Sequence, residues 1–203
     1  MTITRVVVVG GGYAGVLAAN RLSQRSDLDI TLVNPRPIFV ERIRLHQLVA
    51  GNDDAVADYA DILTDRAKLM VDSAQRIDAA DRQLRLTSGV SLGYDYLIYA
   101  VGSSAPVPAA VPGAEEYAYP LGELEAAQRL ARRLAETPLQ APIAVVGGGL
   151  TGIEAASEWA EIGRKVTLVT GALAPSLAND GRKSVAKRLR KLGVSVVENA
   201  TAI

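Results

Sequence analysis

Residues 6–19 read VVVVGGGYAGVLAA and residues 143–156 read IAVVGGGLTGIEAA, and this repeat decides the fold. Aligning Gly10 with Gly147 matches all four glycines, two valines before them and two alanines after them. Each copy is a run of apolar, mostly β-branched residues, a glycine turn and a segment of helical period, which together open a βαβ unit. Strands this apolar are usually buried in a parallel sheet. The repeat therefore predicts an α/β protein with two Rossmann-like domains.

Both copies continue as a doubly wound sheet requires. We expect helices at 13–25, 151–162 and 181–192, and strands at 29–34, 165–170 and 194–198. The second copy stops after its third strand, which is only half of a doubly wound sheet. We therefore expect the second domain to be incomplete, and the chain to be a fragment or a shortened homologue of a longer protein.

The stretch between the two copies has a different pattern. Residues 68–92 alternate between apolar and polar side chains and are punctuated by aspartates and glycine. This pattern predicts an antiparallel β-meander laid over the first sheet. A strand at 94–100 and a helix at 122–136 are expected to follow.

A proline-rich crossing separates the strand at 94–100 from the helix at 122–136. Its prolines are Pro106, Pro108, Pro112 and Pro120. Such composition is typical of a linker between domains. We therefore assign residues 1–112 to the first domain and residues 113–203 to the second.

Composition excludes several classes of function. The formal net charge is zero and no lysine–arginine block stands out, so the basic surface of a nucleic-acid-binding protein is not expected. The chain has no cysteine, which excludes a disulfide framework, a thiolate metal site and a redox-active cysteine pair. Its apolar runs are far too short to span a membrane. With 49% hydrophobic and 22% charged residues, it is typical of a globular protein, and the missing cysteines fit a reducing cytoplasm.

The glycines of the first copy have distinct physical roles. Gly10 allows the tight turn after the strand, Gly12 lets the backbone approach a pyrophosphate, and Gly15 lets the helix pack closely on the strand. The N–H groups and the positive dipole end of the helix then attract the diphosphate. One such motif is weak evidence, but here a strand precedes it and a helix and second strand follow. The alternative, a glycine turn that binds nothing, is disfavoured by that context and by the second copy.

Both copies lack the acidic residue that usually binds the adenosine ribose at the end of the second strand. Asn34 stands there in the first copy and Thr170 in the second. Asparagine can bind a ribose hydroxyl, although without charge assistance. Arg36 and Arg42 follow and can reach a phosphate or adenine, but a solvated loop charge explains them equally well. The preference for NADH or NADPH therefore stays open.

Four segments resemble the flavoproteins that carry two dinucleotide-binding domains. They are residues 10–15, YDYLIYAVGS at 94–103, GGGLTGIEAASE at 147–158 and RLHQLVAG at 44–51. The likeness covers essentially the whole chain and is strongest to the type II NADH dehydrogenases and the apoptosis-inducing-factor-like oxidoreductases. The segment at 94–103 is similar to the family's "ATG" segment, with Val101 in place of threonine. In the segment at 44–51, Gln47 matches a glutamine characteristic of the flavin side of type II dehydrogenases.

The resemblance implies FAD at the first fingerprint and NAD(P)H at the second, with hydride passing to the flavin and electrons on to a quinone or another acceptor. It implies no catalytic triad and no metal, and Glu154 is the candidate nearest the nicotinamide, with an exposed helix-face acid as the alternative. The cofactor-binding residues expected on this basis are Gly10, Gly12, Tyr13, Ala14, Gly15, Asn34, Arg42, Gln47, Ala74, Ala100, Gly102, Gly147, Gly149, Leu150, Thr151, Gly152, Glu154 and Thr170.

The resemblance also implies a C-terminal half that completes the flavin domain and supplies a dimerisation or membrane-facing part. We therefore expect a cytoplasmic homo-oligomer, with any peripheral membrane contact made by parts outside these residues. His46 is expected to be a polar boundary residue, and Trp159 a core residue. Two further hypotheses remain: a reductase of a small iron–sulfur carrier such as ferredoxin or rubredoxin, and a non-catalytic protein that senses dinucleotides or binds a partner.

Overall fold

The computed structural model describes residues 3–104 and 111–201, and the chain divides into two compact units. Unit 1 is formed by Met1–Glu41 and Val56–Ser103, and unit 2 by Arg42–Ala55 and Ser104–Ile203. The chain therefore leaves unit 1 at residue 42, re-enters it at residue 56 and leaves it again at residue 104. The division into domains at residue 112 stays a prediction, and Pro106 and Pro108 of the expected linker lie outside the described residues.

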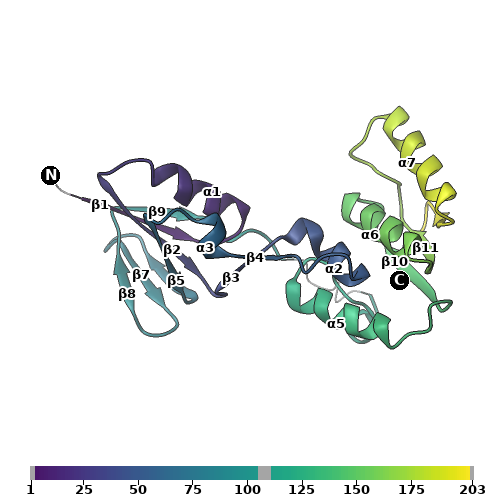
Figure 1. Ribbon diagram of the computed structural model, residues 1–203, viewed down its shortest axis with the longest axis horizontal. Helices are drawn as coiled ribbons and strands as arrows, with labels where there is room; N and C mark the ends of the chain where they lie inside the picture. The colour runs from purple at the N-terminus through teal and green to yellow at the C-terminus, as the bar shows by residue number, and fades with distance from the viewer. Residues whose placement is uncertain (1–2, 105–110, 202–203) are drawn as a thin grey trace. The chain divides into compact units, whose positions relative to one another are not determined.

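A four-stranded parallel sheet forms the centre of unit 1 (Figure 1). Its order is β5 (Ala67–Val71), β2 (Leu28–Asn34), β1 (Thr4–Val9) and β9 (Tyr96–Tyr99), and each neighbouring pair is parallel. The strand β1 lies inside the sheet, with β2 and then β5 on one side of it and β9 on the other. This is the strand order of a Rossmann-like half, as the sequence predicts.

Strand β1 is apolar on both faces because both faces of the sheet are covered. Val6 and Val8 pack with Ala19 of α1 (Tyr13–Leu22), whereas Val7 and Val9 pack with the opposite layer. Side chains of a strand alternate between faces, so a run of four valines fills two separate cores. Unit 1 is thus a layered structure with its sheet in the middle.

The opposite layer is an antiparallel meander of β6 (Ala74–Asp78), β7 (Gln83–Leu86) and β8 (Ser91–Gly93). Leu84 and Leu86 of β7 are buried against the valines of β1. In Figure 1 this layer lies across the sheet from α1. The meander over the first sheet is therefore confirmed.

The predicted start of the meander at residue 68 is wrong. Residues Ala67–Val71 form β5, which pairs in parallel with β2 and belongs to the main sheet. An edge strand of a parallel sheet and a strand of a meander both alternate apolar and polar side chains. Periodicity alone does not indicate which strand such a segment pairs with, so its partner depends on tertiary packing.

Unit 2 contains the second half-sheet, β10 (Pro142–Val146), β11 (Lys165–Val169) and β12 (Ser195–Val197), in that order and parallel throughout. Helices α6 (Leu150–Glu161) and α7 (Asn179–Lys191) connect its strands. The second Rossmann-like half is confirmed, with three strands among the described residues. The predicted helices and strands that the structure contains begin and end within three residues of their expected limits, which is the usual uncertainty of helix and strand ends.

Several short elements were not predicted. In unit 1 they are β3 (Ile38–Val40), which pairs antiparallel with β4 (Val56–Asp58), and α3 (Tyr59–Ile62). In unit 2 they are the 3₁₀ turn η1 (Arg42–Arg44), α2 (Leu45–Ala50) and α4 (Ala114–Tyr117). Segments this short carry too few residues for a periodic signal to emerge.

Helix α2 packs within unit 2 against α5 (Leu124–Ala135) and α6. The indole Nε1 of Trp159, on α6, donates a hydrogen bond of 3.4 Å to the carbonyl of His46 on α2. Trp159 is only 5% exposed, so the prediction of a core tryptophan is confirmed, and His46 is half-buried at the boundary.

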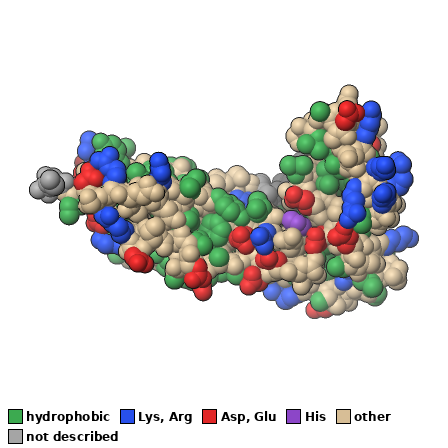
Figure 2. Space-filling view, turned by 45° about the horizontal axis from the view of Figure 1, so that its top comes forward, with side chains coloured by type: hydrophobic (Ala, Val, Ile, Leu, Met, Phe, Trp, Pro, Cys, Tyr) green, Lys and Arg blue, Asp and Glu red, His purple; other side chains and the backbone are tan. Residues whose placement is uncertain are grey.

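Basic side chains gather on the part of the surface that α7 contributes (Figure 2). Two of them form ion pairs, Lys183 with Asp180 at 3.3 Å and Arg188 with Glu161 at 2.5 Å. Arg182 instead donates to the carbonyls of Leu177 and Pro175. Arg182 and Arg188 therefore bond α7 to residues outside the helix, whereas the pair of Lys183 and Asp180 lies within it.

Candidate dinucleotide-binding sites

The first glycine turn closes the carboxyl end of β1. Gly10 has a φ of +104°, and its N–H donates to the carbonyl of Val33 at 2.9 Å. A Cβ at Gly10 would lie 2.4 Å from the carbonyl oxygen of Ala100, which follows β9. Glycine is therefore required twice over, by the backbone conformation and by the close approach of the β9 end. The predicted site residues Gly10 and Ala100 are in contact.

The turn leads directly into α1. A Cβ at Gly15 would lie 1.8 Å from the carbonyl oxygen of Gly10, so this glycine allows the helix to pack on the turn. Gly12, the N-cap residue, is different: a Cβ there would meet no atom of the described chain within 4 Å. The helix N-terminus thus faces open space, where its N–H groups suit a diphosphate.

Gly11 is held from two sides. Its N–H donates to Oδ1 of Asn34 at 3.0 Å, and its carbonyl accepts a hydrogen bond of 2.7 Å from the hydroxyl of Tyr59. Nδ2 of Asn34 donates to the carbonyl of Arg36 at 2.9 Å. Asn34 therefore braces the turn from the position where an acid usually binds ribose. Its predicted contact with ribose stays a prediction.

Tyr59 is a residue of the turn that sequence reasoning missed. It lies on α3, far along the chain, and no motif surrounds it. Burial raises the pKa of its hydroxyl to about 12, although the positive charge of Arg36 opposes the shift. The hydroxyl is therefore a hydrogen-bond donor at all ordinary pH values.

The second glycine turn has the same construction. Gly147 has a φ of +119°, and its N–H donates to the carbonyl of Val169 at 2.9 Å. A Cβ at Gly152 would lie 1.9 Å from the carbonyl oxygen of Gly147, whereas at Gly149 it would meet nothing within 4 Å among the described atoms. The N-terminus of α6 thus faces open space as that of α1 does.

Thr170 takes the place of Asn34 in the second turn. Its Oγ1 accepts a hydrogen bond of 2.9 Å from the N–H of Gly148 and donates to the carbonyl of Ala172 at 3.0 Å. The carbonyl of Gly148 accepts from the N–H of Ala174 at 2.8 Å. Thr170 is buried, so its hydroxyl serves the turn. Its predicted contact with the cofactor is untested.

The remaining predicted residues fall into two groups. Those of the first group are Tyr13 and Ala14 on the first turn of α1, Gly102 just beyond β9, and Leu150, Thr151 and Glu154 at the start of α6, whereas Ala74 is the first residue of β6 in the meander. Glu154 is exposed. Arg42 and Gln47 instead belong to unit 2, where Nε of Arg42 donates to the carbonyl of Gly122 at 2.8 Å. Their predicted role at the flavin stays a prediction.

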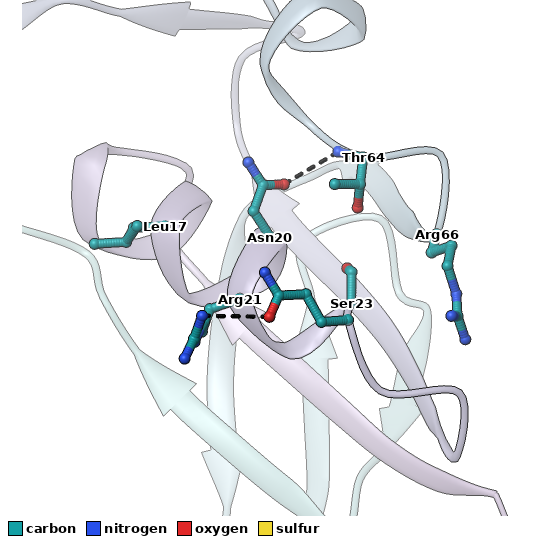
Figure 3. Close-up of a pocket in the computed structure, with 7 residues that line it drawn as sticks. Leu17, Asn20, Arg21, Ser23, Thr64 and Arg66 are labelled. Carbon is teal, nitrogen blue, oxygen red and sulfur yellow. Dashed lines mark hydrogen bonds between the residues drawn. The ribbon is translucent and has the colours of Figure 1, made fainter.

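A cavity of about 400 Å³ opens elsewhere in unit 1, at the C-terminal half of α1 (Figure 3). Asn20 spans it by donating to the carbonyl of Ile62 at 2.7 Å and accepting from the N–H of Thr64 at 3.1 Å. Ser23 donates to the carbonyl of Ala19. The cavity lies at the opposite end of α1 from Gly12, and these polar groups are satisfied by the backbone, so it is separate from the dinucleotide turn.

Neither a cluster of metal ligands nor a membrane-crossing helix occurs among the described residues. Among residues 3–104 and 111–201, no group of three or more His, Cys, Asp or Glu side chains is placed to bind a metal. Over the same ranges, no helix is long and apolar enough to cross a membrane. What both turns offer is a positive helix end, close backbone approach and exposed N–H donors, which fit a diphosphate.

A family model for pyridine nucleotide-disulphide oxidoreductases matches residues 4–202. The chain belongs to the pyridine nucleotide-disulphide oxidoreductase family. This membership confirms the predicted relationship to the FAD- and NAD(P)-binding oxidoreductases and their two Rossmann-like domains. The chain itself contains no cysteine, so the disulphide chemistry in the family's name is not carried by these residues.

Within this family, an NADH dehydrogenase-like protein of Mycobacterium tuberculosis is 34% identical over 171 residues, covering 77% of this chain and 42% of the relative. A type II NADH:quinone oxidoreductase of Staphylococcus haemolyticus is 26% identical over 175 residues, covering 77% of this chain and 43% of the relative. An NAD-dependent persulfide reductase from A. fulgidus has a similar structure, with a TM-score of 0.81 and 26% identity over 97% of this chain and 40% of that one. The chain thus spans less than half the length of these relatives.

Proposed function

We propose that the complete protein is an FAD-dependent NAD(P)H oxidoreductase resembling the NADH dehydrogenases. The observation that carries this proposal is the pair of fully constructed glycine turns in one chain. Each has a positive-φ glycine, a close-packed helix and an open N-terminus. One such turn can hold one dinucleotide, so a chain with two of them can hold the two that electron transfer from NAD(P)H to FAD requires.

The first turn, with Gly10, Gly12 and Gly15, holds FAD, and the second, with Gly147, Gly149 and Gly152, holds NAD(P)H. When both cofactors are bound, the nicotinamide supplies a hydride to the flavin, which passes electrons on. The chain's own residues bind and orient the two diphosphates. Glu154, at the start of α6, is the candidate nearest the nicotinamide. The residues assigned to the flavin side are Arg42, Gln47, Ala74, Ala100 and Gly102.

A quinone is the favoured acceptor, because one similar protein is a type II NADH:quinone oxidoreductase. A small iron–sulfur carrier is the alternative, and turnover with each acceptor under the same conditions decides between them. We place the complete protein in the cytoplasm or at the inner face of the membrane, as a homo-oligomer. Sedimentation and membrane fractionation of the complete protein test these two assignments.

An absorbance spectrum of the purified complete protein tests the proposal directly. We expect a yellow protein whose flavin band bleaches when NADH or NADPH is added without oxygen. A colourless protein that cannot be loaded with FAD would contradict it. Stopped-flow reduction by each nucleotide in turn then gives the cofactor preference that Asn34 and Thr170 leave open.

A second function is favoured by one observation, that neither second strand ends in a ribose-binding acid. A protein with this change can keep the fold and sense a dinucleotide without electron transfer. Calorimetry that detects NAD(P) binding without flavin, together with no turnover with any acceptor, would favour this function over the first.

A further inference from the structure

Tyr59 begins α3, immediately after β4, and is only 4% exposed. Its hydroxyl donates to the carbonyl of Gly11 at 2.7 Å. The fit is close, since a Cβ at Gly11 would lie 2.0 Å from that hydroxyl oxygen. The side chain is thus seated directly against the backbone of the first glycine turn.

The hydrogen bond controls the direction of a neighbouring donor. The carbonyl of Gly11 and the N–H of Gly12 belong to one peptide group, and the described chain has no cis peptide bond. In a planar trans peptide the C=O and N–H point in opposite directions. With the Gly11 carbonyl held by Tyr59, the Gly12 N–H points away from the core. A Cβ at Gly12 would meet no described atom within 4 Å, so the backbone at this residue is open to a ligand.

The aromatic ring of Phe39 packs directly against Tyr59 and is itself packed by Tyr13. Phe39 packs edge-on against Tyr59, with ring centroids 6.3 Å apart, and against Tyr13, at 5.0 Å. Phe39 is 5% exposed. Edge-on aromatic pairs of this kind restrict the orientation of each ring. The hydroxyl of Tyr59 therefore has little freedom to leave the Gly11 carbonyl.

We propose that Tyr59 is a positioning residue for the flavin cofactor, which aims the Gly12 N–H at the diphosphate before the cofactor binds. This inference rests on the proposed function, because it takes FAD as the ligand of the first turn. It adds to that function a residue outside the glycine motif and a preset conformation of the turn. The second turn achieves the same with a backbone donor, the N–H of Ala174 on the carbonyl of Gly148 at 2.8 Å.

Tyr59→Phe in the complete protein is the test, because it keeps the ring and removes only the hydroxyl. Tyr94→Phe is the matched control. Tyr94 is also buried in unit 1, at 7% exposed, and its hydroxyl donates to the carbonyl of Asp78 at 3.3 Å in the meander layer. Each variant loses one buried tyrosine hydrogen bond in the same unit, but only one of those bonds reaches the turn.

We expect Y59F to raise the Kd for FAD about 5- to 10-fold, mainly through faster dissociation, and Y94F to change it less than about twofold. The Kd for NADH at the second turn stays unchanged in both variants. In the apoprotein, Y59F speeds amide hydrogen exchange in a peptide covering residues 10–15, and Y94F does not.

Three results would overturn the inference. If the wild type binds FAD and Y59F binds it equally tightly, the hydroxyl has no positioning role, and the proposed function still stands. Equal losses in Y59F and Y94F show a general loss of stability. A wild type that binds no FAD overturns the proposed function, and this inference with it.

If Y59F does not fold, amide hydrogen exchange of the wild-type apoprotein tests the inference instead. Protection of the amides of residues 10–15 comparable to that of β1 supports a preset turn. Exchange at the rate of an open loop until FAD is added contradicts it.

Discussion

At the scale of single residues, the two turns share a hydrogen bond that the glycine motif does not predict. The middle glycine donates its N–H to a side chain at the end of the second strand, Asn34 in one turn and Thr170 in the other. Both side chains are neutral, and in each the side-chain oxygen accepts a hydrogen bond from the backbone. The residues that replace the usual acids thus have a structural role, which explains why uncharged side chains are tolerated there.

Gly15 and Gly152 provide a paired test of which turn holds which cofactor. We expect Gly15→Ala to weaken FAD binding by about 2 kcal/mol or more, roughly 30-fold, because its Cβ would press on the carbonyl of Gly10. Gly152→Ala should weaken NAD(P)H binding to a similar degree and leave FAD in place. Flavin content and the rate of flavin reduction measure the two effects. Each variant is the control for the other, and loss of both cofactors from either one contradicts the assignment.

Tyr59 also makes a prediction about pH. Its pKa is raised from the ordinary value of 10 to about 12 by burial, so the unfolded state releases this proton first as the pH rises. The folded state binds more protons between about pH 10 and pH 12, and the free energy of unfolding therefore falls across this window. Urea unfolding of wild type and Y59F at pH 9 and pH 11 isolates the contribution. The stability advantage of wild type over Y59F should shrink at pH 11, and an advantage that grows would show that the sign is wrong.

At the scale of elements, β1 is the strand on which unit 1 depends. Its four valines fill two cores, one against α1 and one against the meander. The meander is therefore part of the core of unit 1. It covers a sheet face that would otherwise expose Val7, Val9 and Val33.

Leu84, fully buried on β7, tests this role of the meander. We expect Leu84→Ala to destabilise unit 1 by about 2–5 kcal/mol, because it leaves a cavity beneath the sheet. Leu168→Ala is the matched control, since Leu168 is equally buried on β11 of unit 2. Trp159, the one tryptophan of these 203 residues, reports on unit 2 by fluorescence, and release of FAD reports on unit 1. L84A should shift only the flavin transition, and L168A should shift the tryptophan transition.

At the scale of the whole molecule, each unit carries one dinucleotide turn and one parallel half-sheet. The turns lie at the carboxyl ends of their strands, where ligands of open α/β sheets bind. The segment Arg42–Ala55 leaves unit 1 between β3 and β4 and packs on α5 and α6 of unit 2. Of the strands flanking it, β3 carries Phe39, and β4 leads directly into Tyr59 of α3, which reaches the first turn.

Separate cofactor sites predict separate stabilisation. FAD at about 100 times its Kd should stabilise the folded state that binds it by about 2.7 kcal/mol. Hydrogen exchange of the complete protein should show protection gained in unit 1 with FAD, and in unit 2 with NADH or NADPH. Protection by FAD confined to residues 147–152 would assign the cofactors the other way round.

Much of this organisation follows from the sequence alone. Apolar strands, glycine turns and helical segments in fixed succession predict both Rossmann-like halves, because their signals are local: φ at Gly10, close packing at Gly15 and the side-chain periodicity of the following helix. The pairing of β6 with β7 and of β7 with β8 is also local, because each strand pairs with the next one in the chain. The elements β3, β4 and α2, of three to six residues, escaped prediction because their periodic signal is weak, whereas the equally short β12 was predicted as the continuation of the second βαβ unit.

Contacts between distant residues were decided only by the tertiary structure. Residues 67–71 form backbone hydrogen bonds with β2 and so belong to the parallel sheet. Their alternating pattern fits a strand of the meander equally well. Tyr59 reaches Gly11 across 48 positions of chain, and no motif marks it. The repeat of residues 6–19 and 143–156 thus determines where the two glycine turns lie. Which side chains brace each turn depends on packing. A hydrogen bond requires two groups to meet in space, and the sequence around either residue does not indicate its partner.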